Sequence, residues 1–157
     1  MTKTLVVLGQ GYVGLPLAQA AVRAGWRVFG FDVNAAVVDR LNDGHSHVDD
    51  LSDDDIAAML AAGYCATADA ALIGEADVAT ICVPTPLGDD GAPDLRAVRA
   101  SAELVGAHLK QGATVVLEST SYPGTTDGVV LPITEAHGHA HARDFRLAFS
   151  PDRGTPG

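Results

Sequence analysis

Three glycines place the strongest constraint on how this chain can fold. Gly9, Gly11 and Gly14 have a GxGxxG spacing that directly follows the apolar residues 4–8. A short β-branched run that ends in glycine is typical of a strand buried on both faces. The Ala- and Leu-rich residues 12–24 that follow predict a helix. The chain must therefore turn tightly from a buried strand into a helix.

Each glycine of this loop has a distinct physical role. Gly9 permits the tight turn, Gly11 lets a ligand approach the backbone, and Gly14 allows close packing of helix on sheet. The free N–H groups and helix dipole near Tyr12 favour a bound phosphate. Asp32 ends the second apolar run, 18 residues past Gly14, and its carboxylate suits the hydroxyls of an adenosine ribose. Its charge would repel a 2′-phosphate, so the pattern predicts NAD over NADP; the alternative is a glycine turn without a ligand.

Strand-like and helix-like segments alternate along the rest of the chain. The expected strands are residues 4–8, 27–31, 64–67, 77–83, 113–118 and 145–150, and the expected helices are residues 12–24, 35–43, a stretch capped by Ser52, residues 95–110 capped by Asp94, and one starting near Gly124. Apolar strands that alternate with helices predict a parallel sheet covered on both faces. We therefore expect an α/β, Rossmann-like, doubly wound sheet of about six strands, with residues 1–157 forming one domain.

Composition excludes several classes of protein. A formal net charge of −10 argues against binding nucleic acid, which requires a basic face, and any anionic ligand must be held by local geometry. The apolar runs are shorter than the roughly 18 residues of a membrane span, so we expect a cytoplasmic protein. Cys65 and Cys82 lack the spacing of a disulfide framework or a zinc site. We expect both to be small apolar residues in or near strands.

Two short segments have the composition of a metal site, and each has a simpler interpretation. The acidic residues 53–55 complement a helix dipole if they form the first turn after Ser52. Residues 137–141 read HGHAH, which is also compatible with a solvated loop between a helix and a strand. We favour these interpretations and expect no metal.

Polar segments follow three of the expected strands. Residues 83–86, 118–121 and 150–153 contain hydroxyl or charged side chains, and ligands of open parallel sheets bind beyond the carboxyl ends of the strands. A structural turn explains any one of these segments, but a bound cofactor and substrate better explain all three. Asp152 can orient a water or take a proton. Arg153 suits a phosphate or sugar hydroxyls.

Six segments together resemble one known family. The chain resembles the UDP-glucose/GDP-mannose dehydrogenase family over its whole length, and most closely the bacterial branch that oxidises UDP-N-acetyl-hexosamines. The segments are GQGYVGLPLA (9–18), FDVN (31–34), GHSHVDDLSD (44–53), CVPTPL (82–87), ESTSYPGTT (118–126) and SPDRGTPG (150–157).

The resemblance implies a cofactor and a set of residues that bind it. Enzymes of this family are NAD-dependent 6-dehydrogenases, which oxidise the C6 alcohol of a nucleotide sugar to a carboxylate with two NAD per turnover. By this resemblance the residues in contact with NAD are Tyr12, Val13, Asp32, Thr85 and Thr126.

The resemblance also implies catalytic and substrate-binding residues. Thr120 matches a threonine that helps position the catalytic water. Asp152 stands where the family usually has glutamate, close to the reacting sugar. Arg153 and Gly154 match the start of a substrate-binding loop, although RGTPG differs from the commoner family sequence there.

The family's nucleophile is a cysteine in a GGxC-type motif that lies well beyond the length of this chain. Neither Cys65 nor Cys82 matches it. We therefore expect the chain to be the NAD-binding part of a UDP-sugar dehydrogenase, without the central helix and the C-terminal substrate domain. Such a chain binds NAD but does not catalyse. The full-length protein is expected to be a homodimer, and this chain a monomer.

Two other functions are compatible with a Rossmann domain. A β-hydroxyacid dehydrogenase also opens with a glycine-rich loop, but it does not account for the three polar strand ends. A non-enzymatic NAD-sensing module would leave Arg153 without a role. Ligand preference separates these alternatives, because UDP-sugars, small hydroxy acids and NAD alone would each stabilise a different one of them.

Overall fold

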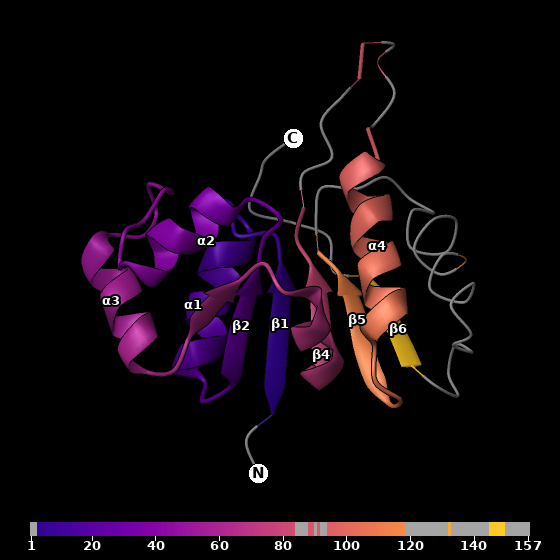
Figure 1. Cartoon of the computed structure of the whole chain (residues 1–157), viewed down its shortest axis with the longest axis horizontal. Coiled ribbons are helices and arrows are strands. Elements are labelled where there is room, and N and C mark those ends of the chain that lie inside the picture. The colour runs from indigo at the N-terminus through magenta and orange to yellow at the C-terminus, as the bar shows by residue number, and fades with distance from the viewer. Residues whose placement is uncertain are drawn as a thin grey trace.

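The fold is a single parallel sheet with helices packed on both of its faces (Figure 1). The computed structural model describes residues 3–83, 88–89, 91, 94–118, 132 and 145–149, the last segment for its backbone only. The strands are β1 (Thr4–Leu8), β2 (Arg27–Phe31), β3 (Cys65–Thr67), β4 (Val78–Ile81), β5 (Ala113–Leu117) and β6 (Phe145–Phe149).

The strand order identifies the topology. The order is β3-β2-β1-β4-β5-β6, and every neighbouring pair is parallel. The chain thus winds outward from β1 in one direction, returns to β4 beside β1, and winds outward in the other direction. This is the doubly wound arrangement of dinucleotide-binding sheets, and it confirms the predicted fold class.

The two faces of the sheet carry different helices. The helical elements are α1 (Gly14–Arg23), α2 (Ala35–Asn42), α3 (Asp53–Ala61), the 3₁₀-helix η1 (Ala70–Glu75) and α4 (Arg96–His108). Alternate residues of β1 point to opposite faces. Leu5 and Val7 pack with α1, α2 and α3, whereas Val6 and Leu8 pack with η1 and α4.

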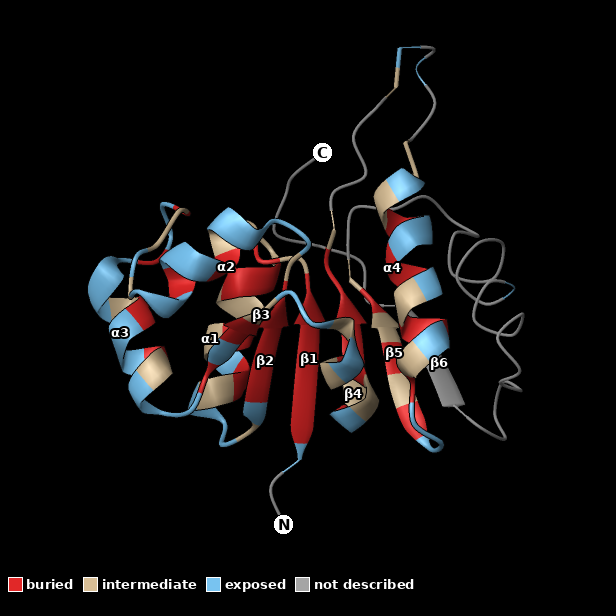
Figure 2. Cartoon of the chain, viewed as in Figure 1, coloured by how far each residue is buried: buried red, intermediate tan, exposed pale blue. Residues whose placement is uncertain are grey.

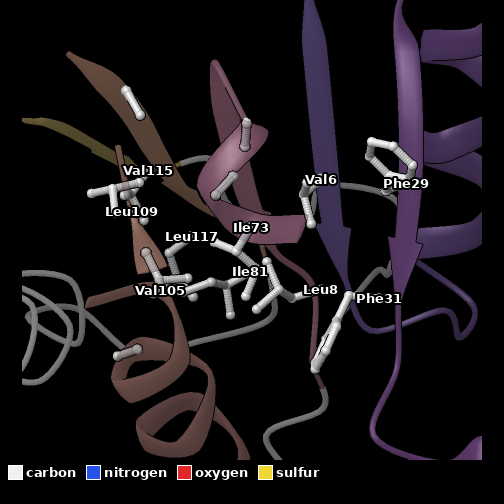
Figure 3. Packing of buried hydrophobic residues seen from close by; sticks show 14 of the residues in the cluster. Val6, Leu8, Phe29, Phe31, Ile73, Ile81, Val105, Leu109, Val115 and Leu117 are labelled. Atoms are coloured by element: carbon white, nitrogen blue, oxygen red, sulfur yellow. The ribbon is translucent and has the colours of Figure 1, made fainter. Parts of the chain in front are cut away.

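Burial follows this two-sided packing. All five residues of β1 are buried, and the helices turn their buried residues toward the sheet (Figure 2). On the η1 and α4 face, Leu8, Ile73, Ile81 and Leu117 each have no exposed surface, and Figure 3 shows their side chains gathered between the strands and the helices. The core is therefore continuous beneath the carboxyl ends of β1, β4 and β5.

Helix α3 begins as predicted. The Ser52 hydroxyl accepts the N–H of Asp55 at 3.1 Å, and the Asp55 carboxylate accepts the N–H of Ser52 at 2.9 Å. This reciprocal pair is a capping box. Asp53 instead holds the N–H of Ser46 at 2.8 Å. Asp55 thus helps to start the helix, whereas Asp53 bonds the connection that precedes it.

Three local features differ from the predictions. Helix α4 starts at Arg96 with Leu95 at the N-cap, so Asp94 is not the cap. The Asp94 carboxylate lies one residue earlier and accepts the backbone N–H and the guanidinium of Arg96. Helix α1 starts at Gly14, two residues later than expected. The 3₁₀-helix η1 was not predicted, and the helix expected near Gly124 lies outside the described residues.

None of the described helices is long and apolar enough to cross a membrane.

Candidate functional site

The glycine loop, residues 9–14, lies at the carboxyl end of β1, between the ends of β2 and β4. Gly9 has a φ of +97°, and its N–H donates to the carbonyl of Phe31 at 2.8 Å. A Cβ at Gly9 would lie 2.7 Å from the carbonyl oxygen of Cys82. A Cβ at Gly14 would collide with the carbonyl oxygen of Gly9 and lie 3.2 Å from the Cys82 Cβ. The tight turn and the close helix packing expected at these two glycines are both present.

Gly11 is in a different environment from the other two glycines. A Cβ at Gly11 would meet no atom within 4 Å. No described residue accepts a hydrogen bond from the N–H groups of Gly11, Tyr12 or Val13. Tyr12 is 65% exposed. The loop therefore presents backbone donors to open space at the start of α1, where the helix dipole is positive, and this is the geometry of an anion site.

Asp32 lies directly beside this loop. One of its carboxylate oxygens accepts the N–H of Gln10 at 3.1 Å, and the other accepts the N–H of Asn34 at 2.9 Å. The side chain is half-buried at the end of β2. Two backbone donors fix the plane of the carboxylate, and each oxygen keeps capacity to accept a further hydrogen bond. The acidic group and the anion-binding backbone are thus parts of one site.

Gln10, between the first two glycines, forms a buried polar network that the sequence did not reveal. Its side chain has no exposed surface. Its amide donates to the carbonyls of Val7 and Gly9 at 2.9 and 3.1 Å, and its side-chain oxygen accepts the Tyr64 hydroxyl at 2.6 Å. A Cβ at Gly30 would collide with both the Gln10 and the Tyr64 side chains, so Gly30 makes room for the pair.

The protonation of Tyr64 is fixed by its surroundings. Burial raises the pKa of Tyr64 far above its usual value, with smaller contributions from Cys65 and Asp32. The hydroxyl therefore stays protonated at neutral pH and can donate a hydrogen bond to Gln10. Gln10 sits at a variable position of the GxGxxG pattern and Tyr64 lies 54 residues further on, so no local signal could have linked them.

The two cysteines occupy different environments. Cys82 follows β4 directly, is buried under Gly14, and has a raised pKa because of burial and the nearby charge of Glu118. It is a packed thiol, as expected. Cys65 begins the edge strand β3, in a strand as expected, and it is exposed. An edge strand leaves one flank uncovered, which accounts for the exposure.

The ends of β4 and β5 reach the same edge of the sheet as the glycine loop. The N–H of Cys82 donates to the carbonyl of Leu8 at 2.7 Å, and the N–H of Glu118 donates to the carbonyl of Ile81 at 2.9 Å. The polar segments expected to bind ligands start at these points. Six of the predicted site residues lie outside the described residues, as does the HGHAH segment: Thr85, Thr120, Thr126, Asp152, Arg153 and Gly154.

The doubly wound sheet, the open glycine loop and the neighbouring carboxylate define a dinucleotide-binding domain of the Rossmann class. The sequence pattern of the NAD binding domain of the UDP-glucose/GDP-mannose dehydrogenase family matches residues 3–157. The chain belongs to this family and is its NAD-binding domain.

Comparisons with individual proteins agree with this assignment. UDP-N-acetyl-D-mannosamine dehydrogenase from Salmonella typhi is 35% identical over 161 residues, which cover 98% of this chain and 38% of the relative. The solved structure of UDP-D-ManNAc dehydrogenase from Pyrococcus horikoshii has a TM-score of 0.90 and 33% identity, and the match covers 98% of this chain and 37% of that one. The chain thus spans well under half the length of these two relatives.

A more distant structural match bears on the β-hydroxyacid alternative. The 3-hydroxyisobutyrate dehydrogenase from Mycobacterium tuberculosis has a TM-score of 0.65 but only 22% identity, with 96% of this chain and 40% of that chain covered. This similarity shows a shared fold alone. The β-hydroxyacid dehydrogenase alternative is not favoured.

Proposed function

We propose that this domain holds NAD for an enzyme that oxidises the C6 alcohol of a UDP-N-acetyl-hexosamine to a carboxylate. The observation that carries the proposal is the open glycine loop, whose unbonded N–H groups lie beside the oriented carboxylate of Asp32. The Salmonella typhi and Pyrococcus horikoshii relatives are both named for a UDP-linked N-acetyl-mannosamine, which supports this class of substrate.

The cofactor contacts follow from the geometry of the loop. The N–H groups of Gly11, Tyr12 and Val13 donate to the pyrophosphate, whose charge is also stabilised by the dipole of α1. Asp32 accepts hydrogen bonds from the adenosine ribose. NAD brings the hydride acceptor, and this chain fixes its position. The family resemblance adds Thr85 and Thr126 as further contacts.

The substrate end of the site is assigned by the family resemblance. By this resemblance Thr120 helps to position a catalytic water, and Asp152 lies near the reacting sugar. Arg153 and Gly154 begin the loop that holds the nucleotide sugar. When bound, NAD would supply the hydride acceptor for each of the two oxidations. All four residues follow β5 or β6 in the sequence, and β5 and β6 are neighbours in the sheet.

Neither cysteine has the properties of the nucleophile that the second oxidation requires. Cys82 is buried and its pKa is raised, whereas a nucleophilic cysteine needs an accessible thiolate. Cys65 lies on the edge strand β3, which is separated from β1 by β2. We therefore expect this chain alone to bind NAD without oxidising a sugar. A homodimeric enzyme in the cytoplasm, with a UDP-sugar as its small-molecule partner, remains the prediction for the whole protein.

Asp32→Ala tests the cofactor assignment. The unmutated chain should bind NAD more tightly than NADP in titration calorimetry. Loss of a charged hydrogen-bond acceptor should weaken NAD binding by roughly 10- to 100-fold. The ratio of NAD to NADP affinity is the decisive quantity, because a general disturbance of the loop would affect both cofactors. Asp39→Ala on the exposed face of α2 is the matched control and should leave both affinities unchanged. Equal affinities of the unmutated chain for NAD and NADP would contradict the ribose assignment.

A thermal-shift series tests the substrate assignment. A ligand that binds only the folded state raises the melting temperature. NAD should raise it, and UDP-N-acetylglucosamine added to saturating NAD should raise it further if the residues after β5 and β6 contribute to the sugar site. A response to NAD with none to the UDP-sugar would favour the NAD-sensing alternative for this chain.

A further inference from the structure

His47 contacts the glycine loop from a distant part of the chain. This residue lies in the connection between α2 and α3, 37 residues after Gln10. Its Nε2 atom is 2.5 Å from the backbone carbonyl oxygen of Gln10. Because a carbonyl only accepts, Nε2 must carry the hydrogen and donate it. The contact therefore fixes both the tautomer of His47 and the direction of the Gln10 carbonyl.

The direction of that carbonyl determines where the next N–H points. The peptide unit that joins Gln10 to Gly11 is planar and trans, so the N–H of Gly11 points away from the carbonyl that His47 holds. That N–H is one of the donors that face open space. In an uninterrupted helix this carbonyl would accept from the N–H of Gly14, but the helix begins only at Gly14 and His47 takes that role.

The other groups of Gln10 are held as well. Its N–H donates to Asp32, and its side chain is fixed by the carbonyls of Val7 and Gly9 and by the Tyr64 hydroxyl. With the carbonyl bonded to His47, every polar group of Gln10 has a partner. Gln10 is thus held by hydrogen bonds at every polar group, whereas the N–H of Gly11 has no acceptor among the described residues.

The segment around His47 is itself anchored on both sides. The N–H of Ser46 donates to the Asp53 carboxylate at 2.8 Å, and this bond is the main reason why the pKa of Asp53 is lowered. On the other side of His47, Val48 is only 4% exposed and packs in the core between the sheet and helices α1, α2 and α3. The connection that presents the imidazole to Gln10 is therefore anchored on both sides of His47.

His47 also carries a cost that stability alone does not explain. Its Nδ1 atom is buried, and no described residue donates a hydrogen bond to it. A buried polar atom without a partner is destabilising, so its presence calls for an explanation beyond packing. An apolar side chain would fill the same space without leaving an unpaired lone pair.

From these observations we infer that His47 is a positioning residue for the cofactor: it holds the Gln10 carbonyl so that the N–H of Gly11 is aimed at the pyrophosphate. This inference rests on the proposed role of the loop in binding NAD. His47 itself does not touch the cofactor; it acts through the Gln10–Gly11 peptide.

His47→Leu, His47→Gln and His45→Leu form the test, with affinities measured by calorimetry below the melting temperature of each variant. His47→Leu removes the donor and should weaken NAD binding roughly fivefold, the effect of one neutral hydrogen bond. His47→Gln places an amide N–H near the Nε2 position and should restore most of the affinity. His45→Leu is the matched control two residues earlier, because His45 is exposed and its imidazole bonds only Asp53 among the described residues.

Adenosine serves as a second ligand, which distinguishes a misdirected Gly11 N–H from a general disturbance of the binding site. It lacks the pyrophosphate, so its weaker binding, followed by NMR titration, should be the same for His47→Leu as for the unmutated chain. His47→Asn is a second variant with an amide too short to reach the carbonyl, and it should behave as His47→Leu does without introducing an apolar side chain.

Three results would overturn the inference: unchanged NAD affinity in His47→Leu and His47→Asn, no recovery in a folded His47→Gln, or an equal loss for adenosine and NAD. Failure of the unmutated chain to bind NAD would overturn the proposed cofactor role together with this inference.

Discussion

The polar groups beside the amino end of β4 have partners within the chain, whereas the loop after the carboxyl end of β1 has backbone donors without an acceptor among the described residues. Before β4, the Asp77 carboxylate accepts the N–H of Thr4 and the ammonium of Lys110, both at 2.8 Å. After β1, the N–H groups of Gly11 and Tyr12 have no acceptor among the described residues. The two places thus differ in whether their polar groups are bonded within the chain.

This difference separates stability from binding within a small domain. Donors that face open space bond to water in the free protein, so they contribute little to its stability until a ligand brings an acceptor. The groups beneath them are closely packed, as Gly9 and Gly14 show. We therefore expect substitutions at the amino edge and beneath the loop to change stability, and substitutions on the open side of the loop to change affinity.

Gly14→Ala should have the largest effect, and it acts on stability. The added methyl would collide with the carbonyl oxygen of Gly9 and lie 3.2 Å from the Cys82 Cβ, and neither is the end of a flexible side chain. Overpacking of this kind costs about 2–3 kcal/mol, which for a domain of this size corresponds to roughly 5–10 °C in melting temperature. Thermal denaturation without NAD measures it. A melting temperature equal to that of the unmutated chain would show that helix and loop can separate without cost.

Gly11→Ala is the opposite case, and it is also the matched control for Gly14→Ala. A methyl at Gly11 would meet no atom of the protein within 4 Å, so the melting temperature without ligand should be unchanged. The methyl would occupy the space through which the pyrophosphate approaches the backbone, so NAD binding should weaken by roughly tenfold or more, about 1.4 kcal/mol. NAD affinity equal to that of the unmutated chain would place the pyrophosphate elsewhere.

The difference between the two edges could be predicted only in part from the sequence. The apolar runs at residues 4–8 and 27–31 have the bounds of β1 and β2, because buried parallel strands are continuous apolar segments ended by a turn or a charge. The glycine spacing and Asp32 then located the carboxyl edge. The 3₁₀-helix at residues 70–75 was missed because it is too short to show a helical period.

The contacts that hold the loop in place could not be predicted. Gln10, His47 and Tyr64 come together only through the fold, across separations of 37 and 54 residues. A glutamine at a variable position of a motif, a histidine among acidic residues and a tyrosine before a strand give no sign of meeting. Sequence patterns indicate the residues that form one turn or one helix. This network depends instead on how the connection between α2 and α3, and the start of β3, pack against the end of β1.

Tyr64→Phe sharpens the comparison beneath the loop. It removes the only described donor to the side-chain oxygen of Gln10, which is buried, so the free energy of unfolding should fall by about 1–2 kcal/mol. Urea denaturation of the chain without NAD measures this change. Tyr12→Phe is the same chemical substitution on the open side, where the side chain is 65% exposed, and it should leave stability unchanged. Equal stabilities of the two variants would show that the Gln10 network does not secure the loop.

Asp77→Asn should have the smallest effect, which is a change in how the stability of the chain depends on pH. The hydrogen bond from Lys110, then that from the N–H of Thr4, holds the pKa of Asp77 below its usual value. A carboxyl whose pKa is lowered by folding contributes stability that is fully present above its unfolded pKa of about 4 and is lost as the pH falls through the lower folded value.

The stability of the unmutated chain should therefore decline more steeply below about pH 4 than that of Asp77→Asn, and the two curves should run parallel from pH 5 to pH 7. Because 39% of the Asp77 side chain is exposed, solvent screening keeps the difference small. Urea midpoints measured across this range, with Asp39→Asn as the control on α2, detect it. NAD affinity at pH 7 should be the same in both variants, since the amino edge lies across the sheet from the glycine loop. A lower affinity in Asp77→Asn would mean that the two edges are coupled through the strands, and the separation of stability from binding would then fail.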